Sequence, residues 1–281
     1  MKNIAIVGLG LIGGSIGLKA KQQDARVIGI PRREETLKRA LELKAIDEGS
    51  LDISKVSEAD MVFICTPINL IIPKLKELAP HLKKGAIVTD VGSTKGEIVS
   101  QAEKLMPKGT YFVGGHPMAG KETVGIEVAE ADLFKDKIWL LTETSKTNNK
   151  ALAEVEEVVS SLGAKVIKLD PKTHDRVAAA ISHVPLAAAA ALVNLAADSE
   201  ERELMAKCAS SGFRDTTRVA SGDPVLGLDM FLTNKVAMAK QLKTLREKLL
   251  DLEKAIKAQD NRKIEAFLRS AKDFRDRLFN L

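Results

Sequence analysis

The sequence predicts an α/β fold, in which an N-terminal Rossmann-type, doubly wound parallel sheet is followed by an all-helical domain. Three observations support this prediction. A glycine-rich turn lies directly after a β-branched run at the N-terminus, short apolar strands then alternate with helices as far as Leu169, and only helical periodicity is found beyond it. We therefore expect two domains, residues 1–170 and 171–281.

The first domain is expected to consist of βαβ units. Its strands are short, apolar runs at residues 2–7, 26–30, 61–65, 86–90, 111–113, 137–141 and 165–169. Its helices have apolar residues at helical spacing and lie at residues 15–22, 36–43, 70–82, 97–105 and 151–162. Because ligands of open α/β sheets bind at the carboxyl ends of the strands, the loops after these strands are the candidate site.

The second domain is rich in alanine and leucine. Its longest apolar stretch, residues 177–197, contains Ser182, His183, Pro185 and Asn194 and consists mostly of alanine, which favours a buried helix over a membrane span. Two charged amphipathic helices are expected at residues 224–258 and 262–279. A thin helical unit with apolar stripes often completes its core by pairing with a second copy, so we expect a homodimer.

Composition and charge restrict the class of protein. The chain is 45% apolar and 29% charged, which is typical of a globular protein. Its two cysteines, Cys65 and Cys208, are too few and too far apart for a disulfide framework, and the glycine-rich N-terminus does not resemble a signal peptide, so a cytoplasmic location is expected. Acidic residues are interleaved with the basic ones that produce the net charge of +5, which favours anionic small molecules over nucleic acid.

The glycine-rich turn has the GxGxxG spacing of a dinucleotide site. Gly8 allows a tight turn, Gly10 lets the backbone approach a pyrophosphate, and Gly13 lets the helix pack on the strand. A plain glycine-rich turn is the alternative, but the position between a strand and a helix favours the cofactor. The expected cofactor-binding residues of this turn are Gly8, Leu9, Gly10, Leu11, Ile12 and Gly13.

The end of the second strand favours NADP over NAD. NAD sites usually place a carboxylate there to bind the ribose 2′-hydroxyl, whereas this chain continues with Pro31, Arg32 and Arg33 before its first carboxylate, Glu34. Either arginine can pair with a 2′-phosphate, and two solvated loop arginines are the alternative. We expect NADP as the preferred cofactor and NAD as the second choice.

Three further loops follow predicted strands. Thr66 and Pro67 follow the third strand and are expected to contact the cofactor. Ser93 follows the next strand, where it is either a site residue or a helix cap. His116 stands between glycines after the fifth strand, and an imidazole there is a candidate general base.

The helical domain adds polar candidates. His174 and His183 are nine residues apart, nearly opposite on a regular helix, so they face one site only if the helix bends, and Pro185 can supply that bend. Arg214 and Arg218 share a helical face and can clamp a carboxylate or form salt bridges. No Cys/His or HExxH ligand spacing occurs, so no metal is expected.

Six segments together resemble the TyrA family, the prephenate and arogenate dehydrogenases of tyrosine biosynthesis: VGLGLIGGS, CTP, TDVGSTK, GGHPMAG, THDRVAAAISHVP and SSGFRDTTRVASGDP. The resemblance implies that His116 takes the ring-hydroxyl proton while hydride leaves for the nicotinamide, after which the ring carboxylate leaves as CO₂. It also implies that Ser93 orients His116 and the hydroxyl and that Arg218 binds a substrate carboxylate. The other implied substrate-binding residues are Ser182, His183, His174, Arg214 and Lys121.

Departures from the family pattern favour arogenate as the substrate. Prephenate-preferring members often have a histidine where this chain has Leu186 and a tryptophan where it has Gly227, and Lys121 replaces a common Thr or Ser. Leu186 together with Arg32 resembles the cyanobacterial arogenate enzymes that use NADP. Prephenate dehydrogenase remains the main alternative. A β-hydroxyacid dehydrogenase or imine reductase would need another proton donor, and a non-catalytic dinucleotide sensor would not need His116, Ser93 and Arg218 together.

Overall fold

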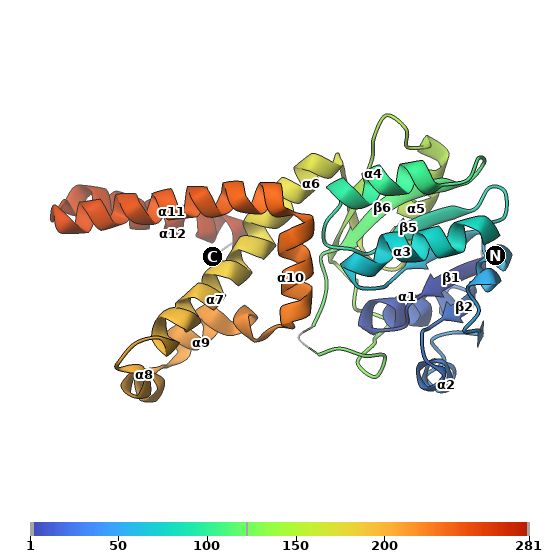
Figure 1. The fold of residues 1–281 in the computed structure, drawn as a ribbon, viewed down its shortest axis with the longest axis horizontal. Helices are drawn as coiled ribbons and strands as arrows, with labels where there is room; N and C mark the ends of the chain where they lie inside the picture. Colours follow the sequence, from blue (N-terminus) through green and yellow to red (C-terminus); the bar gives the residue numbers. More distant parts are fainter. Residues whose placement is uncertain (1–2, 122, 280–281) are drawn as a thin grey trace. The chain divides into compact units, whose positions relative to one another are not determined.

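The computed structural model describes residues 3–121 and 123–279, so Lys2, the expected start of the first strand, lies outside the described residues. Its N-terminal part is an eight-stranded sheet between helices (Figure 1). The strands are β1 (Asn3–Val7), β2 (Arg26–Ile30), β3 (Glu48–Gly49), β4 (Met61–Ile64), β5 (Ile87–Asp90), β6 (Tyr111–Pro117), β7 (Ile138–Thr142) and β8 (Lys165–Leu169). The predicted strands are all present, and β3 is an additional two-residue strand.

The strand order is β3-β2-β1-β4-β5-β6-β7-β8, so the chain reverses direction across the sheet between β1 and β4. Ligands bind at such a switch point in open α/β sheets. The predicted parallel sheet is present with one exception, the antiparallel pair of β6 and β7. The described residues of their connection, 118–121 and 123–137, contain no crossover helix, and a parallel pairing would need one. The sheet is therefore mostly parallel.

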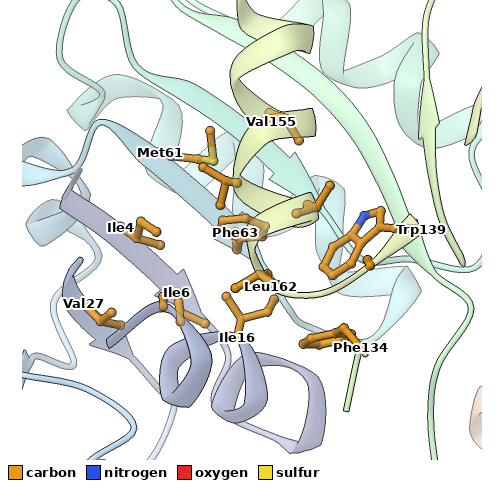
Figure 2. Close-up of a cluster of buried hydrophobic side chains, with 14 of the residues drawn as sticks. Ile4, Ile6, Ile16, Val27, Met61, Phe63, Phe134, Trp139, Val155 and Leu162 are labelled. Carbon is orange, nitrogen blue, oxygen red and sulfur yellow. The ribbon is translucent and has the colours of Figure 1, made fainter. Parts of the chain in front are cut away.

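Helices cover both faces of the sheet. α1 (Leu11–Lys21), α2 (Glu34–Glu42) and α5 (Asn149–Ser161) pack on one face, and α3 (Ile68–Leu78) and α4 (Gly96–Leu105) pack on the other. Figure 2 shows the first core, where Phe63 and Trp139 meet edge to face with ring centroids 6.4 Å apart. Trp139 is fully buried and lies on β7, so this core holds the antiparallel part of the sheet against α5.

One nearly continuous helix begins directly after the sheet. α6 (Pro171–Ala178) passes through a π-helical turn, Ala179–His183, into α7 (Val184–Ala197). The expected bend is therefore a π turn, in which the Val184 N–H bonds the carbonyl of Ala179, five residues earlier. Pro185 follows at the second residue of α7, and because it has no N–H, it leaves a carbonyl of the preceding turn without its helical hydrogen bond.

The prediction that residues 177–197 form a buried helix is wrong for the single chain. Leu192, Val193 and Leu195 of α7 are 40%, 36% and 71% exposed, and Ala189 is the buried residue of this helix. The segment Pro171–Ala197 is long and apolar enough to cross a membrane by length and composition, and 22% of its most apolar window is buried. Neighbouring segments cover just one side of this apolar helix. Its other side therefore needs a further partner.

α8 (Arg202–Cys208), α9 (Ser211–Thr217) and α10 (Pro224–Thr233) follow. The predicted helix 224–258 is two helices, because the chain leaves helical geometry at Asn234 before α11 (Lys235–Lys257) begins. Contacts divide the chain into two compact units, Met1–Asn234 and Lys235–Leu281. The second unit is a hairpin of α11 and α12 (Asn261–Phe279). The expected functional boundary at residue 170 coincides with the end of the last strand, β8, and remains a prediction.

Candidate functional site

The turn between β1 and α1 is shaped by its glycines. Gly8 has φ +99°, and a Cβ there would lie 2.6 Å from the carbonyl oxygen of Cys65. A Cβ on Gly13 would lie 2.1 Å from the carbonyl oxygen of Gly8, whereas a Cβ on Gly10 would meet nothing within 4 Å. Gly8 and Gly13 are thus required by the chain's own packing, and the space at Gly10 is left for something outside the chain.

A cavity of about 600 Å³ opens beside this turn. Its walls come from the carboxyl ends of β1, β2 and β4, and its lining includes Gly8, Leu9, Gly10, Arg32, Arg33, Thr66 and Pro67. Thr66 Oγ1 is buried and has no hydrogen-bond partner among the described residues, so it is available to a ligand. These features fit the pyrophosphate and the adenosine end of a nicotinamide dinucleotide. Leu11 and Gly13 are buried under the turn, and Ile12 packs on the core.

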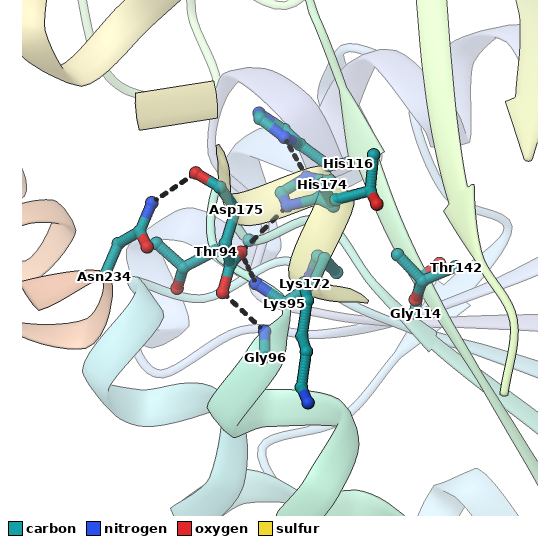
Figure 3. A network of polar contacts seen from close by, with 12 residues as sticks. Thr94, Lys95, Gly96, Gly114, His116, Thr142, Lys172, His174, Asp175 and Asn234 are labelled. Carbon is teal, nitrogen blue, oxygen red and sulfur yellow. Dashed lines mark hydrogen bonds and ion pairs between the residues drawn. The ribbon is translucent and has the colours of Figure 1, made fainter. Parts of the chain in front are cut away.

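His116 is buried near the carboxyl end of β6, at the same edge of the sheet. Its Nδ1 lies 2.9 Å from Nε2 of His174 on α6, and Nδ1 of His174 lies 2.9 Å from Oδ1 of Asp175 (Figure 3). The structure therefore connects His116 to a carboxylate through a second imidazole. Ser93 Oγ, which was expected to orient His116, has no hydrogen-bond partner among the described residues, and His174 makes the hydrogen bond to His116.

The Asp175 carboxylate is held at the N-terminus of α4. Oδ1 accepts from the Lys95 N–H at 2.7 Å, and Oδ2 accepts from the Gly96 N–H at 2.8 Å. A helix N-terminus stabilises negative charge. Burial by itself would raise the pKa of Asp175, but the hydrogen bonds from His174, Lys95 and Gly96 outweigh it and hold the pKa below its usual value. Asp175 is therefore ionised at neutral pH.

The three imidazoles of this region are neutral at physiological pH. Burial lowers the pKa of His116 well below its ordinary value, and the neighbouring His174, Lys95 and His183 add to the shift. Burial also lowers the pKa of His174, against the opposing hydrogen bond to Asp175. The pKa of His183 falls to about 4, mainly through burial. Each ring thus keeps one nitrogen lone pair for a hydrogen bond or a proton.

A buried ion pair supports the same loop. The Lys95 ammonium contacts the Asp90 carboxylate, and both side chains are completely buried. Asp90 also accepts from the Gly92 N–H at 2.8 Å and from the Gly115 N–H at 3.2 Å. Because Gly115 precedes His116 in β6, this pair ties the loop after β5 to the strand that carries the imidazole. Breaking such a buried pair from one side leaves an uncompensated charge.

The π turn brings His183 to the same cluster as His174. Asn234 donates to the backbone carbonyl of Asp175 at 2.9 Å and lies 3.3 Å from Nδ1 of His183. The Ser93 backbone lies beside the His183 ring, and both Ser93 Oγ and His183 Nε2 are buried without a partner among the described residues. Orphaned polar atoms of this kind are a sign of a ligand site.

The other expected substrate-binding residues lie outside this buried cluster. Arg218 is exposed at the end of α9. Arg214 pairs with Asp215 at 3.0 Å, and Lys121 pairs with Glu130 at 3.0 Å, so both are already engaged by carboxylates. Ser182 is half-buried in the π turn.

Leu186 and Gly227, the two departures from the prephenate pattern, lie next to each other. A Cβ on Gly227 of α10 would lie 3.4 Å from Cδ2 of Leu186 on α7. Leu186 thus stands beside a glycine, at the two positions where the resemblance predicted a histidine and a tryptophan for prephenate-preferring members.

Sequence reasoning missed Asp175, Lys95, Asp90 and Asn234. Asp175 directly follows His174 in the THDR segment, and that adjacency was the available signal for it. Asp90 and Lys95 pair with each other within the TDVGSTK segment, and their spacing of five residues was the available signal. Asn234 was not recognisable because its partners, Asp175 and His183, lie on other segments. Among residues 3–121 and 123–279, no three His, Cys, Asp or Glu side chains are grouped to hold a metal ion.

The Rossmann-type sheet, the glycine turn and the buried histidine at the edge of the sheet define a nicotinamide-dependent dehydrogenase. Residues 15–168 match the family described as "Prephenate dehydrogenase, nucleotide-binding domain", and residues 170–270 match "Prephenate dehydrogenase, dimerization domain". The chain belongs to the prephenate and arogenate dehydrogenase family, NAD(P)-dependent oxidoreductases of tyrosine biosynthesis. The resemblance and the fold class predicted from the sequence are thereby confirmed.

Three relatives show the extent of the similarity. The chain is 36% identical to prephenate dehydrogenase of Bacillus subtilis over 280 residues, covering 98% of this chain and 76% of the relative. The structure of Synechocystis arogenate dehydrogenase has a TM-score of 0.89 and 38% identity, covering 98% of this chain and 99% of that one. Prephenate dehydrogenase from Aquifex aeolicus, in complex with hydroxyphenyl propionate and NAD+, has a TM-score of 0.93 and 34% identity, covering 99% and 98%.

Proposed function

We propose that this enzyme catalyses the NADP-dependent oxidative decarboxylation of arogenate to tyrosine, with His116 as the general base. The observation that carries the proposal is the buried, neutral imidazole of His116 at the edge of the sheet that also holds the glycine turn. A base must be neutral before it can accept a proton, and the lowered pKa keeps His116 neutral at working pH.

In the proposed reaction, the substrate ring loses a hydride from the carbon that carries its hydroxyl, and His116 accepts the hydroxyl proton. When bound, the nicotinamide supplies the hydride acceptor. The bond to the ring carboxylate then breaks, CO₂ leaves, and the bonding electron pair makes the ring aromatic. The phenolate oxygen that results takes back a proton, which protonated His116 can donate. Since aromatisation favours the products, the chain mainly positions groups and accepts one proton. The buried, unpartnered hydroxyl of Ser93 is proposed to hydrogen-bond the substrate hydroxyl.

Substrate binding is assigned to the helical side of the site. We propose that Arg218 binds a substrate carboxylate as a charge-assisted pair and that His183 and Ser182 line the pocket. His183 offers a buried nitrogen without a partner among the described residues. Arg214 and Lys121 are secondary candidates, because a substrate carboxylate must compete with Asp215 and Glu130 for them.

The choice of arogenate rests on Leu186. Arogenate carries an ammonium where prephenate carries a keto group, so a pocket for arogenate has no use for an additional cation there. The apolar side chain of Leu186, which stands beside Gly227, meets that condition. The relative from Synechocystis, at 38% identity, is an arogenate dehydrogenase, which agrees with the proposal.

The choice of NADP rests on Arg32 and Arg33. Both are exposed, both line the cavity beside the glycine turn, and no carboxylate ends β2. A guanidinium is well suited to a 2′-phosphate, whereas an NAD site commonly uses a carboxylate for the 2′-hydroxyl. The structure of the Aquifex relative contains NAD+, so NAD is the second cofactor to be tested.

We also propose that the enzyme is a cytoplasmic homodimer joined through its helical part. The match to a dimerization domain over residues 170–270 supports this, and so do the exposed apolar side chains of α7 and α10, among them Leu195, Leu228 and Leu232. A second protein chain covers such helices better than lipid does here, because the same helical segment carries the buried, hydrogen-bonded His174 and His183.

The test is a two-by-two assay of arogenate and prephenate with NADP and NAD, following the reduced cofactor and the aromatic product. We expect the highest kcat/KM with arogenate and NADP. Leu186→His should improve prephenate relative to arogenate, and Leu186→Gln, which adds polarity without a cation, should leave the ratio nearer to the wild-type value. Preference of the wild type for prephenate, or an unmoved ratio in Leu186→His, would overturn the arogenate assignment and leave the family reaction intact.

A further inference from the structure

We infer that Asp175 and His174 are positioning residues that fix the tautomer of His116, so that its Nε2 is the unprotonated nitrogen. The inference rests on the proposed role of His116 as the base and deepens it. It assigns to His174 a task other than lining the substrate pocket, and it brings in Asp175. Three hydrogen-bonded groups, Asp175, His174 and His116, connect the N-terminus of α4 to the proposed base (Figure 3).

The first step concerns Asp175. The main-chain N–H groups of Lys95 and Gly96 can only donate, so Oδ1 and Oδ2 of Asp175 are both acceptors. Neither oxygen therefore carries a proton in these two contacts. The remaining contact of Oδ1, at 2.9 Å from Nδ1 of His174, then needs its proton on the imidazole. Asp175 thus requires the Nδ1–H form of His174.

The tautomer of His174 in turn determines that of His116. A neutral imidazole has one N–H, so with the proton of His174 on Nδ1, its Nε2 is a lone pair. That nitrogen lies 2.9 Å from Nδ1 of His116, and the contact is a hydrogen bond only if His116 donates. His116 is therefore also the Nδ1–H tautomer. Its lone pair is on Nε2, the nitrogen not engaged by His174.

The same contacts also stabilise the positive charge that His116 acquires in the reaction. When Nε2 of His116 takes a proton, the ring becomes a cation whose Nδ1–H still points at the lone pair of His174. The negative charge of Asp175 lies one ring further on, and the Lys95 ammonium nearby is neutralised by Asp90. A fixed donor and acceptor order of this kind needs no rearrangement during the reaction.

The same helix offers a matched control. Asp170 caps the N-terminus of α6 and accepts from the N–H groups of Lys172 and Thr173, each at 3.0 Å. Asp170 and Asp175 thus both accept from two consecutive main-chain N–H groups. Asp170 is exposed, however, and none of its contacts reaches an imidazole. Asp175→Asn and Asp170→Asn therefore make the same chemical change, but only Asp175 is connected to His116.

The first experiment is nitrogen NMR of the full-length protein carrying ¹⁵N-labelled histidine, without substrate, at neutral pH. The chain has four histidines, so His116→Asn and His174→Gln assign the signals. We expect wild-type His116 and His174 both as Nδ1–H tautomers. Asp175→Asn should move His116 toward the Nε2–H form, because the NH₂ group of the introduced amide can donate to His174. Asp170→Asn should leave both tautomers unchanged. The Nε2–H form of His116 in the wild type would overturn the inference without any variant having to fold.

The second experiment separates positioning from folding. Asp175→Asn should lower kcat by about 10²-fold or more, while the KM of the substrate and the Kd of the cofactor change by less than about threefold, as expected for loss of a correctly protonated base. A loss of kcat equal to that of Asp170→Asn would contradict the inference. If instead His116→Asn keeps normal turnover while the tautomers are as expected, the proposed function of His116 fails and the tautomer assignment stands.

Discussion

The glycine turn at residues 8–13 and the imidazole cluster around His116 lie at the same edge of one sheet but are built in different ways. The turn is a single stretch of chain whose shape follows from missing side chains, as the 2.1 Å between a Cβ on Gly13 and the carbonyl of Gly8 demonstrates. The cluster is assembled from β6, α6, the start of α4 and the end of α10, and it is held by side-chain hydrogen bonds. The shape of the turn thus depends on local backbone geometry, whereas the cluster depends on tertiary contacts.

The difference has a physical consequence. A turn that depends on backbone space responds to added volume and has little to do with pH. A cluster of three buried imidazoles responds to protons and to the loss of any one polar partner, because a buried polar group left unpaired costs about 1–3 kcal/mol. Substitutions and pH changes should therefore act on the two regions separately.

The largest effect is expected from His116→Asn. Turnover should fall by about 10²–10⁴, the usual share of general acid–base catalysis, because the introduced amide is a far weaker base. The Kd of NADP, measured by fluorescence titration, should stay near the wild-type value because the cofactor turn is a separate stretch of chain. Normal turnover would show that another group accepts the proton, and loss of cofactor binding would show that the two regions are coupled.

The imidazole cluster should make the protein sensitive to acid. The pKa of His183 is about 4 in the folded chain, against 6.5 for the ordinary residue, so between these values the unfolded chain binds a proton that the folded chain does not. Its contribution to stability is fully present above pH 6.5 and declines as pH falls toward 4, amounting to ~2 kcal/mol lost by pH 5.

Urea unfolding at pH 7.5 and pH 5 measures this loss. His183→Gln should reduce the difference in unfolding free energy between the two pH values. His81→Gln removes an exposed histidine and should leave the difference unchanged. An equal pH dependence in the wild type and in both variants would mean that His183 is not the sensitive group.

A pair of glycine substitutions tests the turn. Gly13→Ala should destabilise the fold by about 1–3 kcal/mol, the usual cost of overpacking, because the obstacle to its Cβ is main chain. Gly10→Ala should leave the thermal midpoint nearly unchanged, since its Cβ meets open space, and should weaken cofactor binding instead. Equal effects of the two substitutions on stability would contradict the assignment of the open space to a ligand.

The most selective effect is expected from Arg32→Ala. The binding free energy of NADP should weaken by roughly 1–3 kcal/mol, the scale of a charge-assisted hydrogen bond, while that of NAD barely changes. Arg39→Ala removes the same charge from α2 at a residue that pairs with Glu42 outside the cavity, and it should affect neither cofactor. An equal loss for NADP and NAD in Arg32→Ala would show that Arg32 does not contact the 2′-phosphate.

Turn chemistry and periodicity act within a few residues, so the glycine turn, the alternation of strands and helices, and the strand ends near Ser93 and His116 could be predicted from the sequence. The loop expected around His116 is instead the last part of β6. The three-dimensional structure was needed to show that β6 and β7 pair antiparallel, that the helix breaks at Asn234, and that His174 connects His116 to Asp175. It also decided that α7 is exposed in the single chain. These features depend on which segments meet across the fold, as His116 and His174 do over 58 residues, and a contact between such segments leaves no periodic trace in the sequence.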